Sequence, residues 1–568
     1  MKTVLRYLRP KAGIIAVEMC IKLAGTVVEL LLPWMLSVIL DEAVPSGDFH
    51  SVLVWGGLMV LCAALAVVGN VAANRISCAT SRDVTHRLRG DLFAKVTRLS
   101  CAQEDAFTTP SLISRLTSDT YNVNQMIDRM QRLGVRAPIL LLGGIALTLS
   151  LEPVLTLVLI ATLPLLGAVV WFVSTRGVRL YTRTQAALDV LVRRSQESMA
   201  GIRVIQALSK GEYEKARFDE ANAQVVDRER RAGLLMNVTN PVMNLLLNAG
   251  LTAVVVAGAF RVNAGHTQPG TIIAFLSYFT IILNALMMVS RMFVMYSKGA
   301  ASGRRIAEVL NAPEELQSRP QPAAGGEEHI RFDHVSFSYG KVEDNLTDIS
   351  FSLRRGETLG IIGPTGSGKS TILQLLLRFY DPDNGVISVD GKDLRSVEPA
   401  ALHSIFGVVF QNDFLYADEI GANIDFGRGL PQERLEAAAR TAQADFINTR
   451  AGGFGAELSP KGANLSGGQK QRVLLARALA ADPDILLLDD SSSALDYKTD
   501  AALRRALARD FKDTTKIIVA QRISSIRSAD RILVLEDGRA VGYGSHDELM
   551  RTCGSYREIA EIQMGEVE

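Results

Sequence analysis

The sequence lacks a strong net charge, paired cysteines and a recognisable cleavable leader. Its 568 residues carry a formal charge of +1 at pH 7, so no nucleic-acid partner is predicted. The five cysteines form no C-x-x-C pair, which argues against a zinc site or a disulfide framework. The first apolar segment is too long for a signal peptide and contains Glu18, Lys22 and Glu29. No protease domain precedes this segment, so peptide export with leader cleavage is not expected.

Hydrophobic residues make up 48% of the chain and are concentrated in its first half. Six segments have the roughly 20 apolar residues that a membrane-spanning helix needs: 13–40, 52–74, 133–151, 154–174, 241–262 and 270–296. They predict an all-α six-helix transmembrane domain over 1–310 and exclude a soluble DNA-repair ATPase. A stretch rich in Pro and Gly, 311–328, reads as a linker. Residues 329–568 have the pattern of an α/β nucleotide-binding domain.

Lysine and arginine are unevenly distributed between the apolar segments. They are frequent before the first segment, over 75–132 and over 176–231, and absent from 41–50 and 150–153. The positive-inside rule therefore predicts a multi-pass protein of the cytoplasmic (inner or plasma) membrane with both termini in the cytoplasm. Helical periodicity over 84–99 and 188–204 predicts that the helices continue beyond the membrane. The chain is expected to reverse near 107–111 and 201–205.

Polar side chains inside the apolar segments are costly in lipid and are therefore candidates for function. One interpretation is a polar, adaptable wall of a substrate cavity, in which methionine re-packs around varied ligands. The other is internal pairing between helices, such as Glu18 with Lys22. The residues concerned are Glu18, Lys22 and Glu29 in the first segment, Asn240, Asn244 and Asn248 in the fifth, and Ser277, Asn284, Met288, Arg291 and Met295 in the sixth.

A glycine-rich loop follows the apolar strand 358–362 and precedes a predicted helix. It reads Gly363, Pro364, Thr365, Gly366, Ser367, Gly368, Lys369, Ser370, Thr371. In this context the backbone N–H groups wrap phosphates and the helix N-terminus adds positive potential. Lys369 is expected to reach the β and γ phosphates, and Ser370 to ligate Mg²⁺. ATP and Mg²⁺ are thus the predicted substrate and metal ion.

A second apolar strand, 485–489, ends in Asp489, whose carboxylate can reach the same Mg²⁺. The next residue, Asp490, is placed to polarise the attacking water. Upstream, a serine and two glycines at a helix start form another anion cradle. This cradle cannot serve phosphates already held by the Lys369 loop, so it suits a nucleotide on a different subunit.

Together these motifs resemble those of an ATP-binding cassette (ABC) exporter half-transporter, over nearly the whole chain. The resemblance implies that Tyr339 stacks on adenine and that Gln411 links Mg²⁺ to the membrane helices. It implies that the 107–111 and 201–205 turns are coupling helices. It also assigns the family signature to Leu465, Ser466, Gly467, Gly468 and Gln469, and the loop between the two ATP sites to Ser493, Ala494, Leu495 and Asp496.

Two catalytic positions depart from the family pattern together. Asp490 replaces a general-base Glu, which withdraws the carboxylate by about 1 Å, and a misplacement of this size can cost roughly a hundredfold in rate. Gln521 replaces a His and cannot carry charge or shuttle a proton. Pro460, in the loop before the signature, stands where the family often has Glu. This departure leaves undecided how the loop contacts the coupling helix of the partner.

The departures predict a heterodimer, because the signature of this chain is intact. Its own site would hold ATP and hydrolyse it poorly, while a second half-transporter with Glu and His intact would turn over. The alternative is a homodimer in which Asp490 is a slow but adequate base. The predicted activity is ATP-driven export of amphipathic small molecules from a lipid membrane. A lipid or glycolipid flippase, and an ATP-binding regulator or gated channel without vectorial transport, remain open.

Overall fold

The computed structural model describes residues 2–564 apart from 314–315, 317, 320–327 and 342–343, so most of the predicted linker lies outside the described residues. The chain divides into two units. The first comprises Met1–Thr97 and Pro110–Ala312, and the second comprises Arg98–Thr109 and Pro313–Glu568. Residues 98–109, which the sequence assigned to the membrane domain, thus belong with the second unit.

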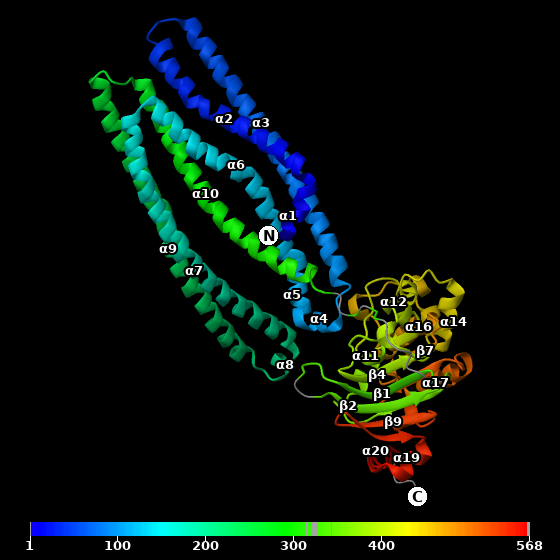
Figure 1. The fold of residues 1–568 in the computed structure, drawn as a ribbon. Coiled ribbons are helices and arrows are strands. Elements are labelled where there is room, and N and C mark those ends of the chain that lie inside the picture. Colours follow the sequence, from blue (N-terminus) through cyan, green and yellow to red (C-terminus); the bar gives the residue numbers. More distant parts are fainter. Residues whose placement is uncertain (1, 314–315, 317, 320–327, 342–343, 565–568) are drawn as a thin grey trace. The chain divides into compact units, whose positions relative to one another are not determined.

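The first unit is helical, as predicted (Figure 1). Five of the six predicted spans each lie within one long helix, and the first, 13–40, runs from α2 into the π-helical turn Ile39–Ala43. The helices are α1 (Lys2–Leu8), α2 (Ala12–Val38), α3 (Phe49–Val96), α5 (Thr109–Ser114), α6 (Thr120–Leu151), α7 (Pro153–Ala200), α8 (Ile202–Ala207), α9 (Gly211–Asn263) and α10 (Pro269–Leu310). By length and composition, five helical stretches among the described residues can cross a membrane, and α7 supplies a shorter apolar stretch, Pro153–Val169.

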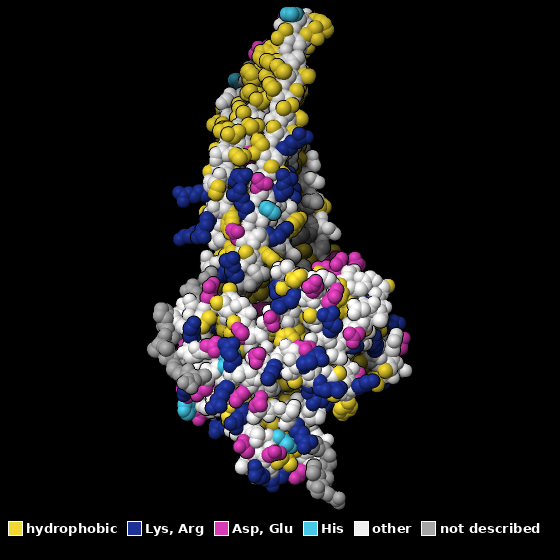
Figure 2. Space-filling model, turned by 90° about the vertical axis from the view of Figure 1, so that its right-hand side faces the viewer, with side chains coloured by type: hydrophobic (Ala, Val, Ile, Leu, Met, Phe, Trp, Pro, Cys, Tyr) yellow, Lys and Arg dark blue, Asp and Glu magenta, His cyan; other side chains and the backbone are white. Residues whose placement is uncertain are grey.

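Three helices are much longer than a bilayer requires. α3 and α7 have 48 residues each and α9 has 53, whereas the hydrocarbon core of roughly 30 Å takes about 20. Figure 2 shows exposed apolar side chains over one end of this unit and Lys and Arg over the rest of the visible face. The predicted extension of the helices beyond their apolar segments is therefore confirmed.

The helices of the first unit pack through small residues and polar contacts. A Cβ on Gly144 of α6 would lie 2.7 Å from Ile282 of α10, so only glycine permits this approach. Arg136 of α6 pairs with Glu29 of α2 at 2.7 Å. α7 and α9 run along each other and diverge from α2 and α3 toward α8 (Figure 1).

The two predicted reversals contain short helices. The first is not one turn at 107–111. A helix, α4 (Cys101–Phe107), begins after the N-cap Ser100 and ends at Phe107, and its C-cap Thr108 has a φ of +60°. The second contains α8 between Gly201 and Lys210, where Ile202 and Val204 of the helix and Leu208 just after it are exposed.

The second unit contains two sheets, as predicted for an α/β domain. One is antiparallel, in the order β2 (Leu346–Leu353), β1 (Ile330–Phe337), β4 (Asn384–Val389) and β5 (Lys392–Asp393). The other has the order β10 (Arg539–Gly544), β9 (Arg531–Glu536), β3 (Thr358–Ile362), β8 (Thr515–Val519), β7 (Ile485–Asp489) and β6 (Phe406–Val409). It is parallel except for β10.

Helices surround the parallel sheet, whose strand β7 is buried along its whole length. Such burial explains the run of four apolar residues before Asp489. The helices are α11 (Lys369–Leu376), α12 (Pro399–Ser404), α13 (Ile420–Asp425), α14 (Gln432–Thr441), α15 (Phe446–Thr449), α16 (Gly467–Ala480), α17 (Tyr497–Asp510), α18 (Ile523–Ile526), α19 (His546–Thr552) and α20 (Gly554–Met564).

Gly360 in β3 gives a test of this packing. A Cβ at this position would lie 2.6 Å from the Cβ of buried Ile526, so Gly360→Ala is expected to cost about 1–3 kcal/mol of unfolding free energy. Gly554→Ala is the control, since nothing lies within 4 Å of its Cβ position. Denaturant unfolding of the full-length protein in detergent measures both, and equal effects would contradict the packing described.

Candidate nucleotide-binding site

Four predicted site segments meet at one edge of the parallel sheet because each follows a neighbouring strand. The glycine-rich loop follows β3, Gln521 follows β8, Asp490 follows β7 and Gln411 follows β6. Ligands of parallel sheets bind at this carboxyl edge. A cavity of about 200 Å³ lies there, lined by Asn345, Thr365, Gly366, Gly368, Lys369, Ser370, Thr371, Gln411, Asp489, Asp490, Val519 and Gln521.

The glycine-rich loop is shaped to hold phosphates. Gly368 has φ +93°, and a Cβ there would lie 2.5 Å from Leu346, so the position requires glycine. The Lys369 ammonium donates to the carbonyl oxygens of Gly363 and Pro364 at 2.9 and 2.6 Å. Burial lowers the pKa of Lys369, while the negative charges of Asp489 and Asp490 act to raise it. The buried hydroxyl of Ser367 has no partner among the described residues, so it is free to donate to a phosphate.

The residues expected to hold Mg²⁺ fit that ion. Asp489 is 5% exposed, and its carboxylate and Ser370 are hydrogen-bonded. Burial raises the pKa of Asp489, and the bond from Ser370 opposes the rise. The described residues contain no group of three or more His, Cys, Asp and Glu suited to a metal. Mg²⁺ needs no such cage, because it commonly takes one or two protein oxygens, phosphate oxygens and water.

Asp490 and Gln521, the two departures from the family pattern, touch each other. The Nε2 of Gln521 donates to Oδ2 of Asp490 at 3.2 Å. Asp490 has φ +47°, a conformation that Asp tolerates better than most residues. Its N–H donates to the carbonyl oxygen of Val519 at 2.9 Å. Burial raises the pKa of the Asp490 carboxyl, and Arg522 and Lys369 act in the opposite direction.

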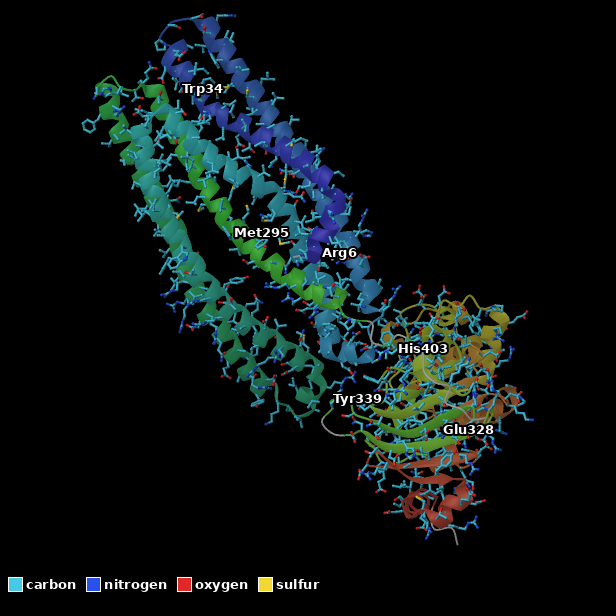
Figure 3. All side chains as sticks on the ribbon, viewed as in Figure 1. Arg6, Trp34, Met295, Glu328, Tyr339 and His403 are labelled. Atoms are coloured by element: carbon cyan, nitrogen blue, oxygen red, sulfur yellow. The ribbon has the colours of Figure 1, made fainter. Side chains whose placement is uncertain are left out.

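Tyr339, labelled in Figure 3, is 44% exposed, and its hydroxyl oxygen lies 3.3 Å from Oγ1 of Thr371 at the end of the phosphate loop. Its hydroxyl donates to Oε1 of Gln374 on α11 at 2.5 Å, and its N–H donates to Oδ1 of Asn345 at 3.0 Å. Tyr380 supports the ring in an edge-to-face contact at 5.1 Å. A supported, half-open ring of this kind can stack on a nucleotide base.

Contacts of Tyr380 explain why residues 98–109 belong to the second unit. Its hydroxyl donates to Oδ2 of Asp105 on α4 at 2.7 Å. Gln103, also on α4, donates to the carbonyl oxygen of Pro313 at 2.8 Å. The sequence analysis missed Asn345, Tyr380 and Asp105, because their role depends on contacts between segments that no local motif marks.

The predicted signature opens α16. Ser466 is the N-cap, and it forms a capping box with Gln469 in which each backbone N–H donates to the other side chain, at 3.0 and 3.3 Å. The box orients the N–H groups that follow it, as an anion cradle requires. Pro460 begins the short 3₁₀ helix Pro460–Gly462 in the preceding loop. Asp496 of the predicted inter-site loop is the N-cap of α17.

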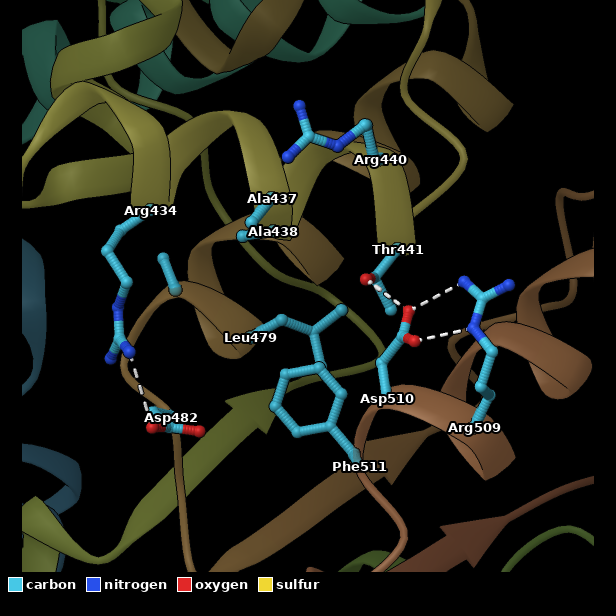
Figure 4. Close-up of a pocket in the computed structure, with 11 residues that line it drawn as sticks. Arg434, Ala437, Ala438, Arg440, Thr441, Leu479, Asp482, Arg509, Asp510 and Phe511 are labelled. Carbon is cyan, nitrogen blue, oxygen red and sulfur yellow. Dashed lines mark hydrogen bonds and ion pairs between the residues drawn. The ribbon is translucent and has the colours of Figure 1, made fainter.

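A larger cavity of about 370 Å³ lies away from the phosphate loop, between α14 and the ends of α16 and α17 (Figure 4). Its arginines are paired locally, with Arg434 bonded to Asp482 at 3.3 Å and Arg509 to Asp510 at 2.6 Å. Acids at the cavity thus already pair with these two arginines, and none of the predicted site residues lines it.

The polar residues of the membrane segments do not form one group. Glu18 and Lys22 are 0% and 2% exposed, so they do not line an open cavity of this chain in this conformation. They do not pair with each other either. Lys22 donates to Asn74 at 2.8 Å, and neither carboxylate oxygen of Glu18 has a partner among the described residues.

The remaining members of the predicted cavity differ in exposure. Glu29 is engaged by Arg136, and Met288 is half-buried. Asn244, Asn248, Asn284 and Arg291 are exposed, and the side chain of Asn240 lies outside the described residues.

Known proteins resemble this chain along its whole length. Residues 15–286 match the ABC transporter transmembrane region, and 346–493 match the ABC transporter family. An uncharacterized ABC transporter ATP-binding protein of Bacillus subtilis, YfiB, is 34% identical over 100% of this chain and 99% of its own length. The chain belongs to the ABC transporter family. It is therefore a transport ATPase, and its ABC domain implies ATP binding.

Two further relatives agree. YfiC, also of Bacillus subtilis and of the same description, is 31% identical and covers 98% of this chain and 93% of its own length. The structure of a bacterial Atm1-family ABC exporter with ATP bound has a TM-score of 0.82 and 26% identity, covering 99% of both chains. The exporter fold of this ABC transporter is thus confirmed.

The contact of α4 with Tyr380 can be tested by hydrogen exchange. Tyr380→Phe keeps the ring beside Tyr339 but removes the bond to Asp105, and a hydrogen bond to a charged group contributes about 1.5–3 kcal/mol. Amide exchange over 101–107 is expected to quicken by roughly tenfold or more through easier local opening. Tyr416→Phe is the control, and unchanged exchange in Tyr380→Phe would show that the bond does not hold α4.

Proposed function

We propose that this ABC transporter is one half of a heterodimeric exporter of amphipathic small molecules, and that its own ATP site holds ATP but hydrolyses it slowly. The observation that carries the proposal is the bond from Gln521 to Asp490 at 3.2 Å, beside an intact capping box at the signature. The residues that would activate water, Asp490 and Gln521, depart from the family pattern. The signature, which would complete the ATP site of another chain, does not.

The chemistry at Asp490 supports slow hydrolysis. A general base must come within about 2.6–3.2 Å of the water that it activates, and the shorter side chain of Asp reaches less far than that of Glu. One carboxylate oxygen also accepts the Gln521 amide. Gln521 in turn cannot accept and pass on a proton, as a His at that position could. Lys369, Ser370 and Asp489 would still bind the phosphates and Mg²⁺, which neutralises charge on the phosphate groups.

Exposed apolar side chains support the presence of a second chain. α4 is attached to the nucleotide-binding unit through Asp105 and Gln103. α8 carries the exposed residues Ile202 and Val204, and Met199 just before it and Leu208 just after it are exposed as well. Clustered exposed apolar residues mark interaction sites. A second half-transporter is the partner that the proposal places there, with membrane lipids around the apolar helices.

ATP bound between two chains would stabilise their closed state more than their open state, and this difference in binding free energy would drive export. Hydrolysis at the partner's site, with Glu and His intact, would reset the cycle. Both termini would lie in the cytoplasm, at the cytoplasmic membrane, because the basic segments 75–132 and 176–231 flank the same ends of the apolar helices. Asn244, Asn248, Asn284 and Arg291 are the exposed candidates for substrate contact.

Restoring the family residues tests the slow site. The chain purified alone is expected to hydrolyse ATP slowly, and the double substitution Asp490→Glu with Gln521→His to raise turnover by roughly tenfold or more. Adding Lys369→Ala to the double variant is the control and should remove the gain. Robust turnover by the unsubstituted homodimer, abolished by Asp490→Asn, would refute the heterodimer.

Transport into proteoliposomes tests the substrate class. Asn248→Leu or Arg291→Gln is expected to reduce uptake of amphipathic dyes severalfold with ATP affinity unchanged, since neither residue belongs to the nucleotide-binding unit. Asn448→Ala, on α15, is the control. Movement of fluorescent lipid without dye transport would indicate a flippase. Nucleotide-dependent closure without any flux would indicate a regulator or channel.

A further inference from the structure

One side chain, Gln471, joins the signature helix to the loop that follows Asp490. Gln471 lies in the second turn of α16. Its Nε2 donates to the carbonyl oxygen of Asp490 at 3.2 Å, and its Oε1 accepts the N–H of Ala494 at 3.1 Å. A single amide therefore spans both ends of the 490–494 loop, using one donor and one acceptor.

Other contacts make this loop a defined unit. The hydroxyl of Ser493 donates to the same Asp490 carbonyl oxygen at 2.9 Å. Gly468 packs directly on the loop, since a Cβ there would lie 3.0 Å from the Ala494 carbonyl oxygen. Asp490 itself is held by Val519 through its N–H. The start of α16 and the backbone of Asp490 are therefore in one connected set of contacts.

This connection joins parts that serve different nucleotides. In the proposed function, Asp490 faces the ATP held by this chain, while Ser466 and Gly467 face the ATP held by the partner. Gln471 lines neither the nucleotide cavity nor the capping box. It can therefore act on both sites only through the position of the groups that it holds.

We infer that Gln471 is a positioning residue, which fixes the signature of this chain relative to Asp490 so that the state of one ATP site sets the geometry of the other. The inference rests on the proposed sharing of each site between two chains. It does not require the two chains to differ.

The test compares two identical substitutions, Gln471→Met and Gln432→Met, in the full-length protein purified with its natural partner. Met has a similar length but no hydrogen-bonding amide. Gln432 is an exposed residue of α14 whose amide donates to Glu436, so it controls for the chemistry of the change. For Gln471→Met, kcat is expected to fall roughly ten- to hundredfold, because the signature is no longer held in register.

The KM for ATP is expected to stay within about twofold, since an interaction needed only in the transition state lowers kcat without changing ground-state binding. Gln471→Glu retains the acceptor for Ala494 but cannot donate to Asp490, so its kcat should fall too. A fall in kcat with unchanged ATP binding separates positioning from a loss of folding. Unchanged kcat, an effect on KM alone, or an equal loss in Gln432→Met would overturn the inference.

Photo-crosslinking with an azido-ATP analogue under vanadate separates this inference from the proposed function. In a heterodimer, Gln471→Met should reduce nucleotide trapped on the partner and leave ATP binding to this chain intact. In a homodimer, trapping should fall on identical chains, which would refute the heterodimer and leave the role of Gln471 supported. Undiminished trapping in either dimer contradicts the role of Gln471.

Discussion

The hydrogen bond from Gln521 to Asp490 is the interaction on which this account depends. It lies where β8 and β7 end side by side, so the order of strands in the sheet brings the two residues together. An Asp in place of a longer acid withdraws the carboxylate, and the amide occupies one of its oxygens. The bond involves neither the phosphate loop nor Asp489, and on this the proposal rests that the site binds ATP but cleaves it slowly.

Residues of the nucleotide-binding site also contact helices that lie outside it. Tyr339 contacts Tyr380, which bonds α4 through Asp105. The Asp490 carbonyl oxygen contacts Gln471 of the signature helix. The positions expected for the adenine and for the Asp490 carboxylate are thus each linked to a different element of the chain. In the proposed function, a nucleotide retained at this site would contact residues that are connected both to α4 and to the signature helix.

Local motifs predicted much of this molecule because strand, loop and helix follow one another in sequence at the phosphate site. The apolar segments likewise predicted the long helices, since the bilayer sets their minimum length. Contacts between distant segments were not predictable. Nothing in the sequence marks Tyr380 as the partner of Asp105, or Gln471 as the partner of Ala494. One interpretation of the sequence was internal pairing of Glu18 with Lys22, but Lys22 donates to Asn74 on α3, because packing decides which polar residues meet.

The identity of the nucleotide retained by the protein tests the central claim most directly. The purified dimer is incubated with Mg²⁺ and ATP at a permissive temperature, passed rapidly through a desalting column and analysed for bound nucleotide, with Lys369→Ala as the blank. Retained nucleotide that depends on Lys369 should be intact ATP, in an amount close to one per copy of this chain. Retention of ADP alone at that site would contradict the account, because Asp490 would then be an effective base.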